Sequence, residues 1–311
     1  MRTLIVHNTK SGFGSDAIFE FERALVRQGD ECVLRVLPDD SGATEAVTDA
    51  EDFDLVVVSG GDGTVANLLY ALRFRGVRTC IFPSGTANLI FGNLGCASEP
   101  WAIAESCVAG AVAETDLGEI SWVDGRGLRK TRGFALMAGS GFDATLMKDA
   151  IPNKRTMGEA AYFAAALANA HPKVVTYDIT VDGRTFRRRG IACIVANNAT
   201  MQGDIDIVSN CTMADGLLDV IVLATTDAVQ LLMPMLSGIF DKKARAGRPF
   251  IEHFVGKSIS VRSSSPMPMQ VDGDVVTDLT MGYEAHALPG ANQLVVDANS
   301  PYRKKGTVRT R

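Results

Sequence analysis

The stretch VVVSGGDGTVANLLYAL (56–72) decides the fold of the first part of the chain. It begins as an apolar run of strand length, passes through three glycines that surround Asp62, and continues as an amphipathic segment. A buried strand followed by a glycine-rich turn and a helix is typical of parallel sheets, because the helix carries the chain back to the start of the next strand. We therefore expect a parallel sheet, with residues 60–64 at the carboxyl end of one strand.

The segments on either side repeat this alternation of strand and helix. Strands are expected at 3–7, 32–37, 54–58 and 79–82, and helices at about 16–28, 43–50, 65–74 and 87–109. Strands that are apolar on both faces indicate a sheet that helices cover on both sides. The order predicts a Rossmann-like α/β domain over residues 1–115.

After about residue 115 the pattern changes to short strands joined by turns. Asp-Gly pairs, which favour tight hairpins, occur at 124–125, 182–183 and 272–273. Two helix-like inserts, 158–170 and 227–240, interrupt the strands. The second part is therefore expected to be mainly antiparallel.

The chain divides accordingly into a first domain and two later parts. The antiparallel domain is expected over residues 116–290. Residues 291–311 form a C-terminal segment with a basic tail, and whether this segment returns to the first domain is left open.

Composition restricts the class of protein. The chain has 311 residues, 46% of them hydrophobic, and its net charge of −5 argues against nucleic acid as the main partner. No apolar run approaches the roughly 18 residues of a membrane span, and the N-terminus is typical of a first strand and not of a signal peptide. The six cysteines contain no CxxC pair, which favours reduced thiols in a cytosolic protein.

Three strand-to-helix loops are rich in glycine and in hydroxyl or amide side chains. Gly60, Gly61 and Gly63 are expected to form a tight turn with positive φ angles, and the helix that begins near Thr64 directs its positive end toward this turn. Such an arrangement binds an anion, typically a phosphate. The loops are HNTKSGFG (7–14), SGGDGT (59–64) and PSGTAN (83–88).

Asp62 requires an explanation, because a carboxylate at the centre of an anion site repels phosphate. We expect it to meet Mg²⁺ bound to a nucleotide, or a substrate hydroxyl. The P-loop motif GxxxxGK[ST] is absent, and no GxGxxG opens the first helix. A P-loop is therefore excluded, and a dinucleotide fold has little support.

These loops and further motifs resemble the diacylglycerol kinase catalytic-domain family, bacterial lipid kinases that are related to sphingosine and ceramide kinases and more distantly to NAD kinases. The matching motifs are NTKSG (8–12), GGDGT (60–64), PSGTANLIFGNLG (83–95), GSGFDA (139–144), ADGLLD (214–219) and VDGD (271–274). The resemblance implies ATP-dependent phosphorylation of a lipid hydroxyl, most directly that of a diacylglycerol. A ceramide or sphingoid-base kinase and a non-catalytic nucleotide- or lipid-binding protein are the alternatives.

The resemblance also implies the fold and the site. It implies a Rossmann-like N-terminal domain and a C-terminal antiparallel β-sandwich domain, with ATP in the cleft between them and Mg²⁺ on the sandwich. The residues it assigns to Mg²⁺ are Thr212, Asp215 and the backbone of Leu217. The residues it assigns to ATP are Asn8, Thr9, Lys10, Ser11, Gly12, Gly60, Gly61, Asp62, Gly63, Thr64, Gly85, Thr86 and Asn88.

Three aspartates are candidates for the proton acceptor. The acid of the family's DGE motif falls on Asp274, whose side chain is one methylene shorter than glutamate and reaches roughly 1.5 Å less far. A base must come within hydrogen-bond distance of its proton, so Asp272 and Asp62 remain alternatives.

A lipid kinase must take its acceptor from a bilayer. Segment 229–250 combines an apolar, Met-rich half with a basic half, which suits contact with anionic lipid, and a buried helix with a solvated end fits it equally well. The tail 302–311 carries five basic residues and suits the same contact. We expect a cytoplasmic, peripherally membrane-associated enzyme, and the resemblance alone suggests a homodimer.

Overall fold

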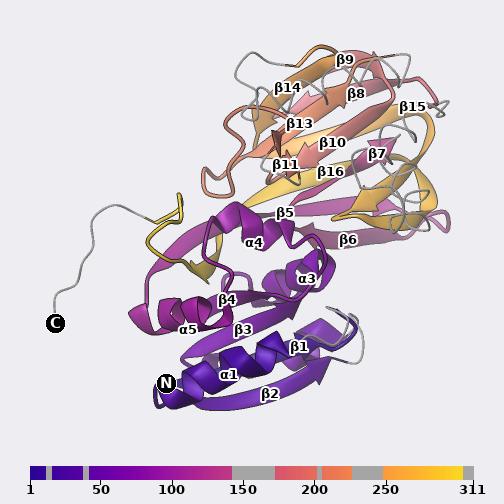
Figure 1. Cartoon of the computed structure of the whole chain (residues 1–311). Helices are drawn as coiled ribbons and strands as arrows, with labels where there is room; N and C mark the ends of the chain where they lie inside the picture. Colours follow the sequence, from indigo (N-terminus) through magenta and orange to yellow (C-terminus); the bar gives the residue numbers. More distant parts are fainter. Residues whose placement is uncertain (12–15, 38–41, 142–171, 202–204, 226–247, 304–311) are drawn as a thin grey trace, which may run out of the picture. The chain divides into compact units, whose positions relative to one another are not determined.

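The computed structural model describes residues 1–11, 16–37, 42–141, 172–201, 205–225 and 248–303 (Figure 1). The chain forms two compact units. Unit 1 comprises residues 1–117 and 289–311, and unit 2 comprises residues 118–288. Unit 1 is therefore built from two separate segments of the sequence.

Unit 1 contains a parallel sheet in the strand order β2-β1-β3-β4. The strands are β1 (Arg2–Asn8), β2 (Glu31–Leu37), β3 (Leu55–Gly60) and β4 (Arg78–Pro83). All four predicted strands are confirmed to within one or two residues at each end. Strand β3 is buried along its whole length, as expected for a strand that is covered on both faces.

The end of the chain completes this sheet. Strand β16 (Asp274–Val295) pairs in parallel with β4 through Gln293 and Leu294. The neighbouring Asn292 is buried and donates from Nδ2 to the carbonyl oxygen of Leu69 at 3.0 Å. Residues 291–296 are therefore an integral part of unit 1.

Helices connect the strands of unit 1 (Figure 1). Helix α1 buries Ile18, Phe21 and Leu25, a spacing that places them on one face, and Phe21 packs against Phe82 of β4 with ring centroids 5.1 Å apart. Among the described residues, no helix is both long and apolar enough to cross a membrane. The helices are α1 (Ala17–Arg27), α2 (Ala43–Ala46), the 3-10 helix η3 (Ala50–Asp52), α3 (Asp62–Leu72), α4 (Leu89–Leu94) and α5 (Pro100–Ala109).

Two predicted helices differ from those in the structure. The helix expected over 87–109 is two helices, because Gly95 adopts a left-handed φ of 66° that ends α4, and Pro100 begins α5. The helix expected over 43–50 is reduced to α2, followed by η3. The predicted helical inserts 158–170 and 227–240 lie outside the described residues.

Unit 2 consists mainly of antiparallel strands, as predicted. Inward-facing side chains of β5, β6, β7, β8, β10, β13, β15 and β16 form one apolar core. The strands are β5 (Val112–Val123), β6 (Arg129–Phe134), β7 (Met137–Gly141), β8 (Val175–Val181), β9 (Arg184–Gly190), β10 (Ala192–Ala196), β11 (Thr200–Met201), β12 (Ile205–Asp206), β13 (Leu218–Leu223), β14 (Ile251–Gly256) and β15 (Ser258–Val271). Together with unit 1, they confirm the predicted fold class of an α/β domain and a β-sandwich domain.

The long strand β15 belongs to two parts of the unit 2 sheet. Its first part pairs with β8 and its last residues pair with β7. Its pairing with β16 shifts register on both sides of Met267. Such irregularities bend a strand, which allows β15 to contribute to both layers of a sandwich.

Two of the three predicted tight hairpins are confirmed. Asp182 and Gly183 join β8 to β9 with φ angles of 47° and 83°. Asp272 and Gly273 join β15 to β16 with φ angles of 47° and 88°. Positive φ at both central residues is typical of the type I′ turn, whose twist matches that of the paired strands.

The third predicted hairpin turn, at 124–125, is wrong. Val123 pairs with Arg129, so the connection between β5 and β6 spans residues 124–128. Asp124 closes this longer loop, because its Oδ1 accepts hydrogen bonds from the N–H groups of Arg126 and Leu128, both at 2.9 Å.

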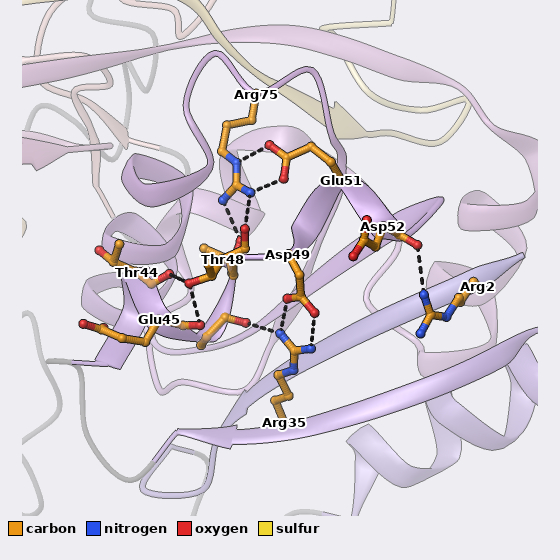
Figure 2. Close-up of polar contacts among 11 residues, drawn as sticks. Arg2, Arg35, Thr44, Glu45, Thr48, Asp49, Glu51, Asp52 and Arg75 are labelled. Carbon is orange, nitrogen blue, oxygen red and sulfur yellow. Dashed lines mark hydrogen bonds and ion pairs between the residues drawn. The ribbon is translucent and has the colours of Figure 1, made fainter.

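Arginine side chains hold the segment between β2 and β3 (Figure 2). Arg35 of β2 donates two hydrogen bonds to the carboxylate of Asp49, at 2.5 and 2.6 Å, and a third to the carbonyl oxygen of Ala46 at 3.0 Å. Arg75, which follows α3, pairs with Glu51 and donates to two further backbone carbonyl groups. Because α2 and η3 have few backbone hydrogen bonds of their own, these side chains fix their position.

The Arg35–Asp49 pair predicts a pH dependence of stability. Hydrogen bonds from Arg35 lower the pKa of Asp49 from 3.8 to about 2. A depressed pKa in the folded state stabilises the protein above the unfolded-state pKa, and this contribution is lost as the pH falls through the folded-state pKa. We therefore predict that the free energies of unfolding of wild type and Asp49→Asn converge as the pH falls from about 5 to about 2.

Urea unfolding followed by circular dichroism at several pH values measures this convergence. Glu45→Gln is the matched control, because the contact of Glu45 in Figure 2 uses its backbone carbonyl group. Its difference from wild type should not change with pH. A difference between wild type and Asp49→Asn that stays constant over the range would contradict the prediction.

Candidate functional site

Three loops of unit 1 meet at one edge of the parallel sheet. They follow β1, β3 and β4, which are neighbours in the sheet, so their carboxyl ends lie side by side. The three glycine-rich loops therefore lie next to one another at this edge. We name them loop A (residues 8–11), loop B (residues 60–64) and loop C (residues 83–88).

Two side chains of loop A are hydrogen-bonded to loop B. Asn8 Nδ2 donates to Thr64 Oγ1 at 2.8 Å, and both residues are buried. Ser11 Oγ accepts a hydrogen bond from the N–H of Gly61 at 3.1 Å. The Oδ1 atom of Asn8 also accepts from the N–H of Lys10 at 3.0 Å. The amide of Asn8 therefore shapes loop A and joins it to loop B.

Asp62 connects loop B to the helix after loop C. Its Oδ1 accepts a hydrogen bond from the N–H of Ile90 at 2.9 Å. Ile90 is the second residue of α4, so the carboxylate satisfies a donor at the amino end of that helix, where a negative charge is favourable. The sequence analysis predicted a cation or a substrate hydroxyl beside Asp62, and it missed this structural role.

Helix α3 begins at Asp62, three residues before the start of the helix predicted at about 65–74, with Gly61 as its N-cap. The N–H of Val65 donates to the carbonyl oxygen of Gly61 at 2.9 Å and closes the first turn. The amino end of α3, with its positive dipole end, is therefore part of loop B itself.

The glycines of these loops are needed because backbone segments approach closely, and the predicted positive φ angles do not occur. Gly60, Gly61 and Gly63 all have φ outside the positive range, so that prediction is wrong. A Cβ atom on Gly60 would lie 2.6 Å from the Cβ of Thr64, and one on Gly85 would lie 2.5 Å from the Cα of Gly61. Loops B and C therefore touch backbone to backbone.

Asn88 closes loop C. Its backbone is left-handed, with φ 48° and ψ 44°, a conformation that asparagine tolerates better than most residues. Its Oδ1 accepts from the N–H of Gly85 at 2.7 Å, and its Nδ2 donates to the carbonyl oxygen of Gly85 at 2.8 Å. Asn88 thus fixes the turn that brings Gly85 against loop B.

The remaining residues predicted to bind ATP surround this frame. Thr9, Lys10 and Thr86 are exposed, and Gly63 is half-buried. Gly12 lies outside the described residues. The amino end of α3, the loop hydroxyl groups and the ammonium group of Lys10 together suit an anionic ligand such as a phosphate.

A hydrogen-bond chain with a buried inner end, which no pattern in the sequence predicted, runs beside these loops. His7 Nδ1 and Ser59 Oγ are 2.9 Å apart, and Ser59 Oγ and Ser84 Oγ are 2.7 Å apart. Burial lowers the pKa of His7 below its ordinary value of 6.5. The signal in the sequence was a polar residue near the end of each apolar strand, but the register that pairs His7 with Ser59 is visible only in the structure.

In unit 2, Asp272 is a structural residue. Its carboxylate accepts three backbone hydrogen bonds, from the N–H groups of Ala135, Leu136 and Met137 at 2.8, 2.9 and 3.0 Å. Its own N–H donates to the carbonyl oxygen of Met137 at 2.8 Å. Because both carboxylate oxygens are engaged by the fold, Asp272 is a weak candidate for a proton acceptor.

Asp274, the first residue of β16, has a different environment. Its side chain is 59% exposed, and its Oδ2 accepts a hydrogen bond from Arg132 of β6 at 3.0 Å. The guanidinium group orients the carboxylate without covering it. Of the two aspartates in VDGD, Asp274 is therefore the one that a reacting hydroxyl can approach.

The three residues predicted to bind Mg²⁺ lie in the loop before β13. Asp215 is exposed, and its Oδ1 accepts from the N–H of Leu217 at 3.0 Å, whereas Thr212 is half-buried. Within the described part of the chain, no three His, Cys, Asp or Glu residues are arranged to hold a metal. A cation here would be held by one carboxylate with hydroxyl and carbonyl oxygens, which are ligands that Mg²⁺ accepts.

Family models match both units of the chain. The model of the diacylglycerol kinase catalytic domain matches residues 2–120. The model of the YegS C-terminal NAD kinase beta sandwich-like domain matches residues 137–296. Each model coincides with the part of the chain for which the sequence motifs imply it.

Individual proteins show the same similarity. A diacylglycerol kinase of Mycobacterium tuberculosis is 28% identical over 249 residues, which cover 79% of this chain and 78% of that protein. An uncharacterized protein of Synechocystis is 29% identical over 252 residues, which cover 78% of this chain and 54% of that protein. The chain thus spans about half the length of this second relative.

Solved structures share the fold. A crystal structure of a diacylglycerol kinase from Bacillus anthracis has a TM-score of 0.68 at 19% identity and covers 96% of this chain and 97% of that one. Yeast NADH kinase, crystallised with NADH, has a TM-score of 0.52 at 13% identity and covers 96% and 84% of the two chains. At these identities the likeness shows the fold alone.

The environment of Asp272 predicts a large effect on stability. Asp272→Asn keeps a residue that tolerates left-handed φ but removes the charge and turns an NH2 group toward a backbone N–H. We predict a loss of about 2 kcal/mol in the free energy of unfolding, because backbone donors lose a charged acceptor. Asp274→Asn, which disrupts only an exposed ion pair, should cost less than about 1 kcal/mol. Urea unfolding measures both, and equal losses would contradict the assignment.

The contact between Gly61 and Gly85 predicts an effect on ligand affinity. A methyl group in Gly85→Ala would meet loop B, and relieving such overpacking costs about 1–3 kcal/mol. We predict that affinity for a nucleoside triphosphate falls about tenfold or more. Competition with a fluorescent analogue measures it. Gly92→Ala is the control, since a Cβ there meets nothing within 4 Å, and equal affinities of the two variants would contradict the prediction.

Proposed function

The chain belongs to the diacylglycerol kinase catalytic-domain family, and from this premise we propose that it transfers the γ-phosphoryl group of ATP to the hydroxyl of a diacylglycerol-type lipid. Membership in a lipid kinase family makes the chain a phosphotransferase of the kinase class. The observation that carries the proposal is the frame of loops A, B and C, in which side chains of loop A hold the amino end of α3 and Asp62 of loop B caps α4.

ATP is bound by this frame in the proposal. Phosphoryl transfer requires chiefly that the reacting groups are aligned and that the charge on the γ-phosphate is stabilised. The amino end of α3 supplies N–H groups and a positive dipole end, and Lys10 supplies a positive charge. The hydrogen bonds of Asn8 and Ser11 to loop B hold these donors in place before ATP binds, so binding costs little reorganisation.

Asp274 is the proton acceptor in the proposal. The alternatives are already engaged, since Asp272 accepts three backbone hydrogen bonds and Asp62 caps α4. Asp274 is exposed and oriented by Arg132, and it accepts the proton of the lipid hydroxyl as the new bond to phosphorus forms.

Mg²⁺ has two roles in the proposal. The ion that accompanies ATP neutralises phosphate charge when bound. Thr212, Asp215 and the backbone carbonyl of Leu217 hold a second, structural ion, and their oxygen atoms fit its ligand preference. Asp215 then organises the loop before β13 through its hydrogen bond to the N–H of Leu217 as well.

The place of action follows from the acceptor. A lipid with two acyl chains resides in a bilayer, so the proposal includes a cytoplasmic enzyme that contacts the membrane surface peripherally. From the family resemblance alone, we also propose that the protein forms a homodimer. Most of segment 229–250 and of the basic tail 302–311, which suit contact with lipid, lies outside the described residues.

The test is transfer of labelled γ-phosphate from ATP, with Mg²⁺, to acceptors in mixed micelles. The panel holds diacylglycerol, monoacylglycerol, ceramide, sphingosine, phosphatidylglycerol and NAD. We expect label in diacylglycerol. Label in ceramide or sphingosine would move the acceptor to the sphingoid class, label in NAD would overturn the lipid assignment, and no label from protein that binds ATP would favour a non-catalytic binding protein.

The role of Asp274 is tested in the same assay. We predict that Asp274→Asn lowers kcat by about 100-fold or more, as loss of a general base does, and that Asp274→Glu retains turnover. Asp178→Asn is the control, because Asp178 is also a partly exposed carboxylate that pairs with an arginine of unit 2, Arg187. Unchanged turnover in Asp274→Asn would remove Asp274 from the mechanism.

A further inference from the structure

We propose that the hydrogen-bond chain formed by His7, Ser59 and Ser84 fixes the Ser84 hydroxyl as a hydrogen-bond donor to the phosphates of the bound nucleotide. In this proposal Ser84 is a binding residue, and His7 is a positioning residue that acts through Ser59. The identity of the ligand rests on the proposed function. The hydrogen-bond chain itself is supported by the two contacts of 2.9 and 2.7 Å and by the burial of His7 and Ser59.

The chain crosses three neighbouring strands at their carboxyl ends. His7 of β1 and Ser59 of β3 are directly paired in the parallel sheet, and Ser84 directly follows β4. His7 is 8% exposed and Ser59 is fully buried, whereas Ser84 is half-buried. The chain therefore starts in the core and ends in loop C, beside the frame described above.

The position of Ser84 is fixed by its backbone as well. Its N–H donates to the carbonyl oxygen of Gly60 at 3.2 Å, which ties the first part of loop C to loop B. With both its backbone and its side chain held, Ser84 has little rotational freedom to lose when a ligand binds. A donor that is ordered in advance contributes more to affinity than a flexible one.

The number of protons gives the chain a direction. Each serine hydroxyl has one proton, so Ser59 donates to one neighbour and accepts from the other. If His7 Nδ1 donates to Ser59, then Ser59 donates to Ser84, and the Ser84 proton is left for a ligand. If Ser84 donates inward instead, its proton is used within the chain. An anionic ligand that only accepts hydrogen bonds favours the outward direction.

The environment of His7 is compatible with this direction. Burial lowers the pKa of His7 below its ordinary value of 6.5, so the neutral imidazole predominates near pH 7. A neutral ring carries one N–H, which the proposal places on Nδ1. A protonated ring would also donate from Nδ1, so acidification does not reverse the chain.

A purely structural role does not explain why these positions are polar. The residues that directly precede His7 in β1 and Ser59 in β3, at 4–6 and 55–58, are buried and aliphatic. Polar groups at such depth cost free energy unless each is paired, and apolar side chains would fill the space at lower cost. The polar groups lie at the carboxyl ends of these strands, next to the loops, where a ligand can use the outer end of the hydrogen-bond chain.

The first test replaces His7. Asparagine places a nitrogen at the same number of bonds from Cβ as Nδ1, whereas glutamine places it one bond further. We expect His7→Asn to retain affinity for ATP within about threefold, and His7→Gln and His7→Leu to lose about tenfold. The readout is competition of ATP with a fluorescent ATP analogue, without lipid. Equal loss in the asparagine and glutamine variants would contradict the role of Nδ1.

The second test is a double-mutant cycle of His7→Leu and Ser84→Ala. If His7 acts through Ser84, the double variant binds ATP no more weakly than Ser84→Ala alone. If the effects multiply, or if His7→Leu lowers the melting temperature and leaves ATP affinity unchanged, the role of His7 is purely structural and the proposal is wrong. Thermal unfolding without ligand confirms that every variant is folded before affinities are compared.

Failure of the proposed function is distinguishable from failure of this inference. Wild-type protein that does not bind ATP overturns both. Wild-type protein that binds ATP but phosphorylates no lipid overturns the acceptor assignment, and the cycle still decides the role of His7. Wild-type activity on a lipid combined with multiplicative effects in the cycle overturns the inference alone.

Discussion

The backbone contact between loops B and C is the constraint on which the site in unit 1 depends. A Cβ on Gly85 would lie 2.5 Å from the Cα of Gly61, so the two loops can touch only because residue 85 carries no side chain, whereas a Cβ on Gly61 would stand at an ordinary 3.7 Å from the Cα of Gly85. Asp62 of loop B caps α4, the helix that follows loop C. Asn88 closes loop C itself. Gly85 thus determines how closely two strand-to-helix connections approach.

The acidic residues of the glycine motifs are used largely to satisfy backbone donors. Asp62 accepts from the first turn of α4, and Asp272 accepts from three consecutive N–H groups in unit 2. A carboxylate is well suited to this task, because its two oxygens accept several hydrogen bonds and its charge strengthens each of them. An aspartate beside glycine is therefore no proof of catalysis, and the exposed Asp274 differs from both by facing solvent.

Much of the fold follows from the sequence, because apolar runs of strand length and turn residues are local signals. The strands of unit 1, the turns at Asp182 and Asp272, and the neighbouring loops are of this kind. A glycine, however, can be required either by a positive φ angle or by the close approach of another group. Only the structure shows that close approach is the reason at Gly60 and Gly85. The partners of His7 and Asp274 depend on register between strands distant in sequence, which no local pattern encodes.

The two-segment construction of unit 1 has a consequence for how the protein is made. The edge of β4 receives its partner, residues 293–294 of β16, only after the ribosome has synthesised all of unit 2. Until then, β4 presents unpaired backbone groups of the kind through which nascent chains associate wrongly. Loops A, B and C are translated early, yet the sheet that bears them is completed only near the end of synthesis.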